Sequence, residues 1–317
     1  MRWIPLLFFC LVDLLILYFI PQIKISFGPP KPQALLLMFL RTPFIWLPLP
    51  INLVFQIIGT GLVIWGFIYE PSRINITHKE INTHLHTDQT TKFIHIGDLH
   101  LEKIGRREEE LLTKLTITKP DFILFTGDFL NLSYRSNPEA IKTVAEYFNK
   151  IQQIAPIYWV TGSPAVDLEK SITEIDSLTQ ATWIKDSAIL IKNNIELIGI
   201  NCTHQPQNDI LKLDIVKRIN QPVFTILIYH SPDLILELDS HKIDLMLSGH
   251  THGGQVRFPL IGALFTGSLY GRNLQAGEYW FHNTMLYITR GIGLEGLGAP
   301  RVRFLCPPEI IEWTIRH

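Results

Sequence analysis

The feature that most restricts the fold of this 317-residue chain is the scarcity of charge in its first 69 residues. Only five charged side chains occur there, namely Arg2, Asp13, Lys24, Lys31 and Arg41, whereas charged residues make up 18% of the whole chain. Apolar surface on this scale is unfavourable in water. The region is therefore expected to lie in a membrane or in a buried core, and the rest of the chain must supply any soluble domain.

Two apolar stretches make up this region. Residues 4–20 just reach the roughly 20 residues that a membrane-crossing helix needs, and no small-x-small cleavage site of a signal peptide follows them. Residues 34–69 are interrupted by three prolines, so residues 51–69 are predicted to form a second spanning helix and the earlier half a re-entrant or interfacial piece. Buried helices of a soluble core are the alternative. We predict a membrane anchor of two hydrophobic helices in residues 1–70 and a linker in residues 71–90.

From residue 91 onward, short runs rich in β-branched residues alternate with helical patterns. This alternation favours an α/β domain in which loops at strand ends carry the chemistry. Strands are predicted at residues 92–96, 122–125, 157–160, 195–200, 223–229 and 245–247, and helices at 106–118, 138–154, 167–178 and 209–219. The final third is predicted to form a meander of strands at 278–282, 285–289, 302–305 and 310–315.

Charge and cysteine usage exclude some classes of protein. The net charge is −1, from 28 basic and 29 acidic residues, so the chain lacks the basic surface of a nucleic-acid-binding protein. The three cysteines, Cys10, Cys202 and Cys306, are too far apart for a disulfide framework or a zinc knuckle. Reduced thiols favour a cytosolic environment, whereas the Lys and Arg residues near the apolar segments do not decide the membrane topology.

Polar residues suited to metal binding follow four of the predicted strands. Strand ends hold such side chains in fixed positions, and imidazole and carboxylate groups are ligands of divalent transition metals. A single histidine of this kind is more often a surface or core residue, but the ordered set favours a metal centre. The set consists of Asp98 and His100, then Asp128, then His230, then His250 and His252.

These residues resemble the motifs of the calcineurin-like metallophosphoesterases, whose pattern is D-x-H, G-D, G-N-H, a lone His and G-H-x-H. The sequence is most similar to a membrane-anchored bacterial branch, through GHTHGGQVRFP at 249–259, RGIG at 290–293 and RVRFLCPPEI at 301–310. The resemblance implies a catalytic domain in residues 91–317 with a four-layer α/β sandwich, in which two mixed β-sheets are flanked by helices. The broader group includes hydrolases of UDP-2,3-diacylglucosamine in lipid A synthesis.

The resemblance also implies a role for each residue of the set. Asp98, His100 and His252 would hold one metal, Asp128 would bridge to a second, and His230 and His250 would hold that second ion. Two divalent ions are implied, with Mn²⁺ favoured over Fe, Zn or Mg. In two-metal hydrolases the pair activates water and stabilises the charge on the phosphoryl group. Asp128 and His230, together with Arg290, are the candidate catalytic residues.

The sequence departs from the family pattern at residues 162–167, where GSPAVD stands in place of G-N-H. The metal-ligating Asn is replaced by Ser163, and the His that stabilises the leaving group is replaced by Pro164. One explanation is a helix start, with Ser163 as the N-cap and Pro164 in the first turn. The other is that Ser163 or Asp167 contributes weakly to the second metal, while helix N–H groups receive a phosphate oxygen.

Two further residues have open interpretations. Arg290 could hold a phosphate through both guanidinium nitrogens or lie at the surface. His204 could face the substrate or be a solvated loop residue.

The favoured function is hydrolysis of a phosphate ester or pyrophosphate in a membrane lipid or nucleotide-lipid, with UDP-2,3-diacylglucosamine as the first choice. The expected location is the bacterial inner membrane, with the catalytic domain on the cytoplasmic face and no protein partner. A general phosphodiesterase, a lipid phosphatase and a catalytically silent metal-binding membrane protein are the alternatives.

Overall fold

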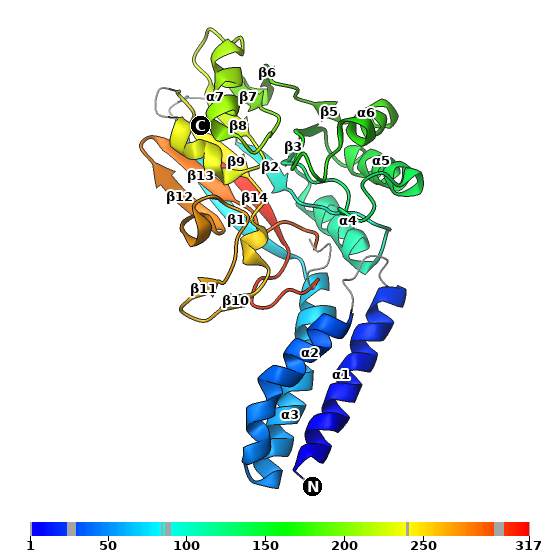
Figure 1. The fold of residues 1–317 in the computed structure, drawn as a ribbon. Helices are drawn as coiled ribbons and strands as arrows, with labels where there is room; N and C mark the ends of the chain where they lie inside the picture. Colours follow the sequence, from blue (N-terminus) through cyan, green and yellow to red (C-terminus); the bar gives the residue numbers. More distant parts are fainter. Residues whose placement is uncertain are drawn as a thin grey trace.

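A globular head and a helical stalk make up the molecule in a computed structural model (Figure 1). The structure describes residues 2–23, 30–83, 85, 90–238, 241–294 and 301–316. The N-terminus lies at the far end of the stalk, and the C-terminus lies on the head, away from the stalk (Figure 1).

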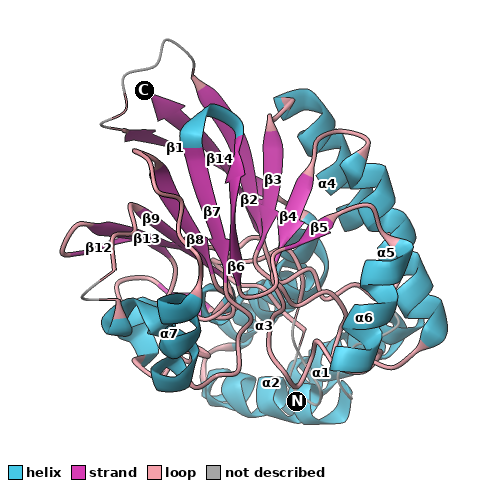
Figure 2. Ribbon diagram, turned by 90° about the horizontal axis from the view of Figure 1, so that it is seen from above, coloured by secondary structure: helices cyan, strands magenta, loops and turns pink. Residues whose placement is uncertain are grey.

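Two six-stranded mixed sheets form the centre of the head (Figure 2). The first has the order β1-β14-β2-β3-β4-β5, and the second has the order β12-β13-β9-β8-β7-β6. Strands β2, β3, β4 and β5 run parallel, as do β7, β8, β9 and β13. The first sheet consists of β1 (Asn75–Asn82), β2 (Thr91–Ile96), β3 (Phe122–Phe125), β4 (Ile157–Trp159), β5 (Thr182–Trp183) and β14 (Glu309–Arg316). The second consists of β6 (Ser187–Ile191), β7 (Ile195–Gly199), β8 (Phe224–Ile228), β9 (Leu245–Ser248), β12 (Gly277–Phe281) and β13 (Thr284–Ile288).

Alternation of side chains along the strands creates three apolar layers, because successive residues point to opposite faces of a sheet. In β2, Phe93 packs between the two sheets, whereas Ile94 packs under the helices of the first sheet. In β8, Ile226 packs between the sheets and Leu227 packs on the opposite face. The covering helices are α4 (Arg106–Thr118), α5 (Pro138–Gln152) and α6 (Glu169–Leu178) on one side, and α7 (Pro206–Ile215) with η5 (Pro232–Glu237) on the other. The expected pair of mixed sheets flanked by helices is confirmed.

The C-terminal third differs from the predicted meander. Strands β12 and β13 form an antiparallel hairpin in the second sheet, but β14 inserts between β1 and β2 of the first sheet. The predicted strand at 302–305 is absent, and only Phe304 forms an isolated bridge there, with Val256. Apolar runs alone do not specify a partner, so local patterning cannot show that the chain crosses from one sheet to the other.

Strand β1 lies in the range expected as a linker. It pairs in parallel with β14 over its whole length, from Asn75 opposite Glu309 to Asn82 opposite Arg316. The first sheet of the head therefore begins at residue 75, and among the described residues only the parts of this range before and after β1 are free of strand pairing.

The stalk contains three helices where two were expected: α1 (Trp3–Ile23), α2 (Pro30–Arg41) and α3 (Leu49–Ile64). Short 3₁₀ and π turns follow, namely η1 (Thr42–Trp46), η2 (Trp65–Tyr69) and η3 (Glu70–Ser72). Prolines near the start of η1 and α3 explain the break, because proline is tolerated in a first turn and disrupts a helix interior. Among the described residues, one helical run, Leu49–Ser72, is long and apolar enough to cross a membrane by length and composition.

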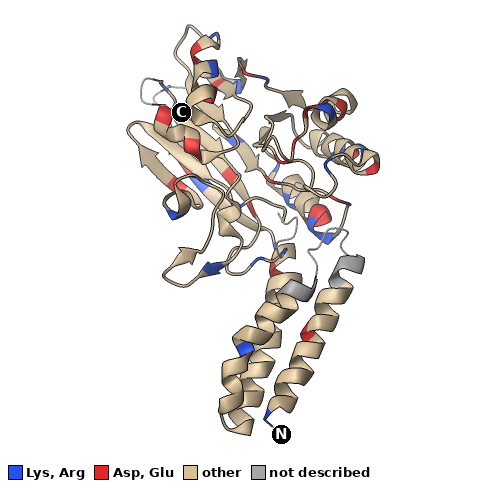
Figure 3. Cartoon of the chain, in the orientation of Figure 1, with Lys and Arg blue, Asp and Glu red and all other residues tan. Residues whose placement is uncertain are grey.

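Charged side chains are rare in the stalk (Figure 3), and two of them pair inside it. The guanidinium of Arg41 at the end of α2 lies 2.6 Å from the carboxylate of Asp13 in α1. The hydroxyl of Thr60 in α3 donates to the same carboxylate at 2.7 Å. Arg41 also donates to the carbonyl of Gln56 at 3.1 Å. One buried polar network therefore joins all three helices.

The stalk is bonded directly to the head. The backbone N–H of Arg303 donates to the carbonyl of Gly66 at 2.9 Å, and the N–H of Cys306 donates to the carboxylate of Glu70. Val302 packs with Val63 and Phe67. The segment predicted as a strand at 302–305 thus forms the contact between the head and the stalk.

Candidate metal centre

The candidate ligands meet where parallel strands of both sheets end. Asp98 and His100 follow β2, and Asp128 follows β3. The N–H of Asp98 donates to Gly127 O at 2.9 Å, so these two strand-end loops run side by side. His230 follows β8 in the other sheet, and the N–H of Gly249 after β9 donates to His230 O at 2.9 Å. The two-sheet architecture brings these loops to one edge.

The first cluster consists of Asp98, His100, Asp128 and His252, all buried. One ligand atom from each lies within 4.8 Å of those of the others. The Nε2 atoms of His100 and His252 face each other at 2.9 Å. His252 Nε2 lies 3.7 Å from a carboxylate oxygen of Asp98, and His100 Nε2 lies 3.5 Å from Asp128.

Asp128 lies between this cluster and a second one. Its Oδ2 atom is 3.4 Å from His230 Nε2, while the same oxygen is 3.5 Å from His100 Nε2. The second cluster consists of His204, His230 and His250. The ring centroids of His204 and His250 are 4.5 Å apart. His204 therefore lies beside the candidate ligands, on the solvent-exposed side of the second cluster.

Ser163 lies at the second cluster, and Asp167 does not. The hydroxyl of Ser163 is 3.1 Å from His230 Nε2 and 3.4 Å from both His250 Nδ1 and Asp128 Oδ2. The carboxylate of Asp167 instead accepts the N–H groups of Gly162, Asp128 and Phe129 at 2.7–3.0 Å. Asp167 thus holds the two loops together.

The explanation of Ser163 as a helix N-cap is wrong. Helix α6 begins at Glu169 and its N-cap is Leu168, so no helix N-terminus is available at residue 163 to receive a phosphate oxygen. The N–H groups of Val166 and Asp167 both donate to Ser163 O at 2.8 Å, which makes residues 163–167 a turn. Gly162 allows this turn to approach the ligand, because a Cβ atom there would lie 2.1 Å from the Asp128 carboxylate.

The backbone is left-handed at most of the candidate ligands. Their φ angles are +49° at Asp98, +43° at His100, +60° at Asp128, +70° at His250 and +50° at His252. This region is uncommon for residues other than glycine, and such strain concentrates at functional sites. His204, with φ of +58°, shares the conformation.

Electrostatics differ sharply among the buried groups. Burial raises the pKa of Asp98 to about 6. Burial also opposes ionisation of Asp128, but the positive charge and hydrogen bond of His230, with a smaller contribution from His100, outweigh it and hold the pKa of that carboxyl well below its usual range. Burial would lower the pKa of His230, but the Asp128 carboxylate raises it to about 10. Burial lowers the pKa of His250 to about 3.

The donor arrangement fits a bound cation. The Nε2 atoms of His100 and His252 lie 2.9 Å apart, so both rings direct a lone pair or an N–H group into the space between them. Asp98 Oδ2 is buried and accepts no hydrogen bond from the described residues. A buried carboxylate oxygen without a hydrogen-bond donor lowers the stability of the fold unless it is paired with a charge or coordinates a metal. Imidazole and carboxylate donors at this density suit divalent transition metals.

Arg290 is not brought to the clusters. Its guanidinium bonds to the buried carboxylate of Glu309, with Nε at 3.1 Å from one oxygen and Nη2 at 3.1 Å from the other. The two-pronged interaction predicted for a phosphate is therefore made with a residue of β14.

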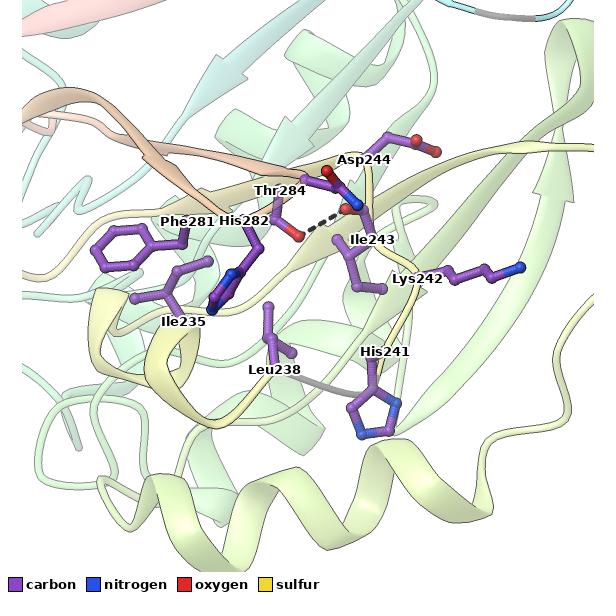
Figure 4. A pocket seen from close by; sticks show the side chains of 10 residues that line it. Ile235, Leu238, His241, Lys242, Ile243, Asp244, Phe281, His282 and Thr284 are labelled. Atoms are coloured by element: carbon purple, nitrogen blue, oxygen red, sulfur yellow. Dashed lines mark hydrogen bonds between the residues drawn. The ribbon is translucent and has the colours of Figure 1, made fainter.

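A cavity of about 340 Å³ opens onto the second cluster. Asp128, Ser163, His204, His250 and Phe265 are among the residues that line it. A second cavity of similar volume lies elsewhere, beneath the turn between β12 and β13 (Figure 4). His241 and His282 line it from separate loops, and none of the candidate ligands reaches it. The chemistry therefore belongs to the first cavity.

Together, the mixed sheets and the paired donor clusters define a metal-dependent phosphoester hydrolase. The sequence pattern of the calcineurin-like phosphoesterases matches residues 91–254, and the chain belongs to this family. Enzymes of the family use two divalent metal ions.

Relatives of the chain carry names of the same class. It is 29% identical over 255 residues to the uncharacterized metallophosphoesterase YkuE of Bacillus subtilis, covering 78% of this chain and 87% of that protein. It is 31% identical over 200 residues to the phosphodiesterase YaeI of Escherichia coli, covering 61% of this chain and 69% of YaeI. It is 23% identical over 308 residues to the UDP-2,3-diacylglucosamine pyrophosphatase LpxG of Chlamydia trachomatis, covering 78% of this chain and 91% of LpxG.

Proposed function

We propose that this protein is a membrane-anchored hydrolase that cleaves a phosphate ester or pyrophosphate in a lipid, with UDP-2,3-diacylglucosamine as the favoured substrate. The convergence of donors from both sheets on Asp128 supports the hydrolytic part. The apolar stalk supports a position at the bilayer. The name of LpxG supports a nucleotide-lipid substrate.

In this proposal Asp98, His100 and His252 hold one divalent ion, and Asp128 lies between it and a second. His230 and His250 hold the second ion, and the Ser163 hydroxyl adds a weak ligand. Mn²⁺ is the favoured metal, and Fe, Zn and Mg also suit donors of this kind. When bound, such a pair activates water and stabilises charge on the phosphoryl group.

The rest of the chain supplies orientation and access. Asp167 fixes the Asp128 and Ser163 loops against each other through three backbone N–H groups. The cavity beside the second cluster admits the phosphate and its leaving group. Residues 1–70 anchor the protein, residues 71–90 lead from the anchor into the head and include its strand β1, and residues 91–317 carry the chemistry.

The proposed location is the inner membrane of a bacterium, with the head on the cytoplasmic side. Free thiols at Cys10, Cys202 and Cys306 support a reducing compartment. Anchoring keeps the cavity close to lipid head groups and raises the effective concentration of a lipid substrate.

The test is a substrate panel for the purified full-length protein with Mn²⁺. UDP-2,3-diacylglucosamine is expected to yield UMP and the lipid phosphate faster than phospholipids or prenyl phosphates react. A general phosphodiesterase, which the similarity to YaeI supports, would instead cleave a chromogenic soluble diester and leave the nucleotide-lipid intact.

Asp128→Asn is the matched control for this panel. The substitution keeps the shape of the side chain but removes the charge between the two clusters. Changes around metal ligands cost about 10- to 100-fold, so loss of the central ligand is expected to reduce turnover by at least about 100-fold and to release both ions. Two ions per chain and unchanged turnover in this variant would contradict the assignment of the site.

A further inference from the structure

An exposed apolar hairpin lies between the metal centre and the stalk. It consists of β10 (Arg257–Phe258), β11 (Gly262–Ala263) and the segment that follows, to residue 269. From residue 258 to residue 271 the sequence contains no charged side chain. Six large apolar side chains in this hairpin are exposed, namely Phe258, Leu260, Ile261, Leu264, Phe265 and Leu269. Contiguous apolar surface of this kind marks a site of interaction with a protein or a membrane.

The turn of the hairpin exposes a leucine, Leu260, in a strained backbone conformation. Leu260 is fully exposed, and its φ angle is +66°. Glycine or asparagine normally occupies this conformation in a turn, because other side chains are strained there. A strained leucine at an exposed tip does not stabilise the head, so the tip is suited to a contact outside it.

The base of the hairpin is tied to the stalk. The N–H of Arg257 donates to Phe304 O at 2.9 Å, and the neighbouring N–H of Arg303 donates to Gly66 O in the stalk at 2.9 Å. Val256 packs in the same apolar cluster as Val63. The hairpin therefore starts at the level of the last turns of the apolar run Leu49–Ser72.

This level corresponds to the membrane interface if the run crosses a bilayer. Gly66 lies six residues before Ser72, the end of the run, which is about 9 Å at a helical rise of about 1.5 Å per residue. The head-group region on each side of a bilayer is roughly 5–8 Å thick. Gly66 and the hairpin base would thus lie near the boundary between head groups and acyl chains.

The other end of the hairpin touches the metal centre. The Gly267 carbonyl lies 3.1 Å from His250 Nε2, and Phe265 lines the cavity at the second cluster. Fewer than ten residues of chain therefore separate the exposed tip at Leu260 from Gly267, which contacts the candidate ligand His250.

We propose that residues 257–269 form a second membrane contact, which enters the head-group region of the same leaflet as the stalk and guides the phosphate of a lipid into the cavity. The lipid bilayer is the binding partner of this surface. This inference rests on the membrane association in the proposed function, and the experiment separates the two.

Fluorophore depth in vesicles gives the direct test, using the full-length protein and no turnover. The background is Cys10→Ser, in which the remaining Cys202 and Cys306 are buried. One added cysteine per protein, at Leu260→Cys, Ile57→Cys or Leu190→Cys, is labelled with an environment-sensitive dye, and each protein is reconstituted into phosphatidylcholine–phosphatidylglycerol vesicles. Ile57 lies exposed on α3 and reports whether the stalk is in the bilayer. Leu190 is an exposed leucine of β6, on the part of the head far from the stalk (Figure 1).

The expected result is quenching of the labels at 260 and 57 by lipid-borne nitroxides, with the label at 190 quenched only by aqueous iodide. Quenching by lipid at 57 but not at 260 would overturn the hairpin contact and leave membrane association intact. Absence of lipid quenching at both positions would overturn membrane association, and the hairpin contact with it.

Activity gives a second readout with a matched control. The double variant Leu260→Ser, Ile261→Ser changes two side chains that do not line the cavity, and Leu190→Ser is the control. Because the double variant removes two apolar side chains from the proposed contact, it is expected to lose roughly tenfold in cleavage of a vesicle-borne lipid. Hydrolysis of a soluble diester is expected to stay unchanged. Equal activity of the double variant and the control on vesicles would contradict a role of the contact in substrate delivery.

Discussion

At the scale of single residues, the second metal position is built differently from the first. The first cluster has three candidate ligands besides the shared Asp128, and all of its members are buried. The second combines the histidines with the hydroxyl of Ser163, at 3.1 Å from His230 Nε2. A neutral hydroxyl is a weaker metal ligand than an amide carbonyl, which presents its oxygen without shedding a proton. The second ion should therefore exchange more readily than the first.

Ser163→Asn is predicted to tighten the second metal position. The side chain lines the cavity, so a longer one can extend toward His230 and His250 without entering the core. An added ligand is expected to lower the metal concentration for half-maximal activity by about tenfold, comparable to measured effects of groups around metal ligands. Metal titration followed by activity measures the change. Unchanged metal dependence would show that residue 163 does not reach the second ion.

His204 is predicted to assist the leaving group. Burial, together with the positive charge of His230, lowers the pKa of His204, so its ring can carry a donor N–H while remaining uncharged. A hydrogen-bond donor placed at the charge that develops in the transition state contributes about 10²- to 10³-fold. His204→Ala should lower turnover of an alkyl diester by about 100-fold and that of a nitrophenyl diester only slightly, with metal content unchanged.

A comparison of the two leaving groups separates this role from metal binding. If His204 is a ligand of the second ion, the variant will lose metal and both substrates will slow equally. Metal analysis of the same samples decides between the two outcomes.

The candidate ligands could be predicted from sequence because each follows an apolar strand within a short, recognisable motif. Asp167 and His204 could not be assigned, because their positions depend on loops from different strands. Asp167 reaches the N–H groups of Asp128 and Phe129, about forty positions earlier in the chain. The partner of Arg290 could not be predicted for a similar reason, since Glu309 lies on a strand whose place in the sheet no local pattern reveals.

At the scale of elements, the stalk helices depend on one buried ion pair. Asp13 and Arg41 lie on different helices, and both are nearly inaccessible. Sequence alone identified both as isolated charges in apolar surroundings, but their pairing depends on how α1 and α2 pack against each other. The structure thereby explains why two charges are tolerated in the stalk.

Single replacements of this pair are predicted to destabilise the stalk, and the double replacement to restore it. Removal of one partner leaves a buried charge unpaired, which typically costs about 3–5 kcal/mol, whereas replacing both by apolar residues is often neutral. Asp13→Leu and Arg41→Leu should each lower the melting temperature of the full-length protein in detergent. The double variant should recover most of the loss, and additive losses would contradict direct coupling.

At the scale of the whole molecule, the stalk is the proposed anchor, and its contacts also stabilise the head. No candidate ligand precedes residue 98, so a protein that begins at Arg73 should retain its metal centre. Truncation nevertheless removes the acceptors of the Arg303 and Cys306 N–H groups and uncovers Val302. Loss of such buried hydrogen bonds and apolar contact is worth about 2–4 kcal/mol, so the truncated head should melt several degrees lower than the full chain.

Activity of the truncated head should depend on the form of the substrate. A soluble diester should be hydrolysed within about twofold of the full-length rate, because the truncation leaves the ligand loops of both sheets intact. A vesicle-borne lipid should be hydrolysed much more slowly, because the effective concentration gained by tethering is lost. Equal rates on vesicles for both proteins would contradict the proposed role of the stalk. Loss of the soluble activity together with the fold would show instead that the contacts of Gly66 and Glu70 are required to hold segment 301–306, and through it the hairpin, against the metal centre.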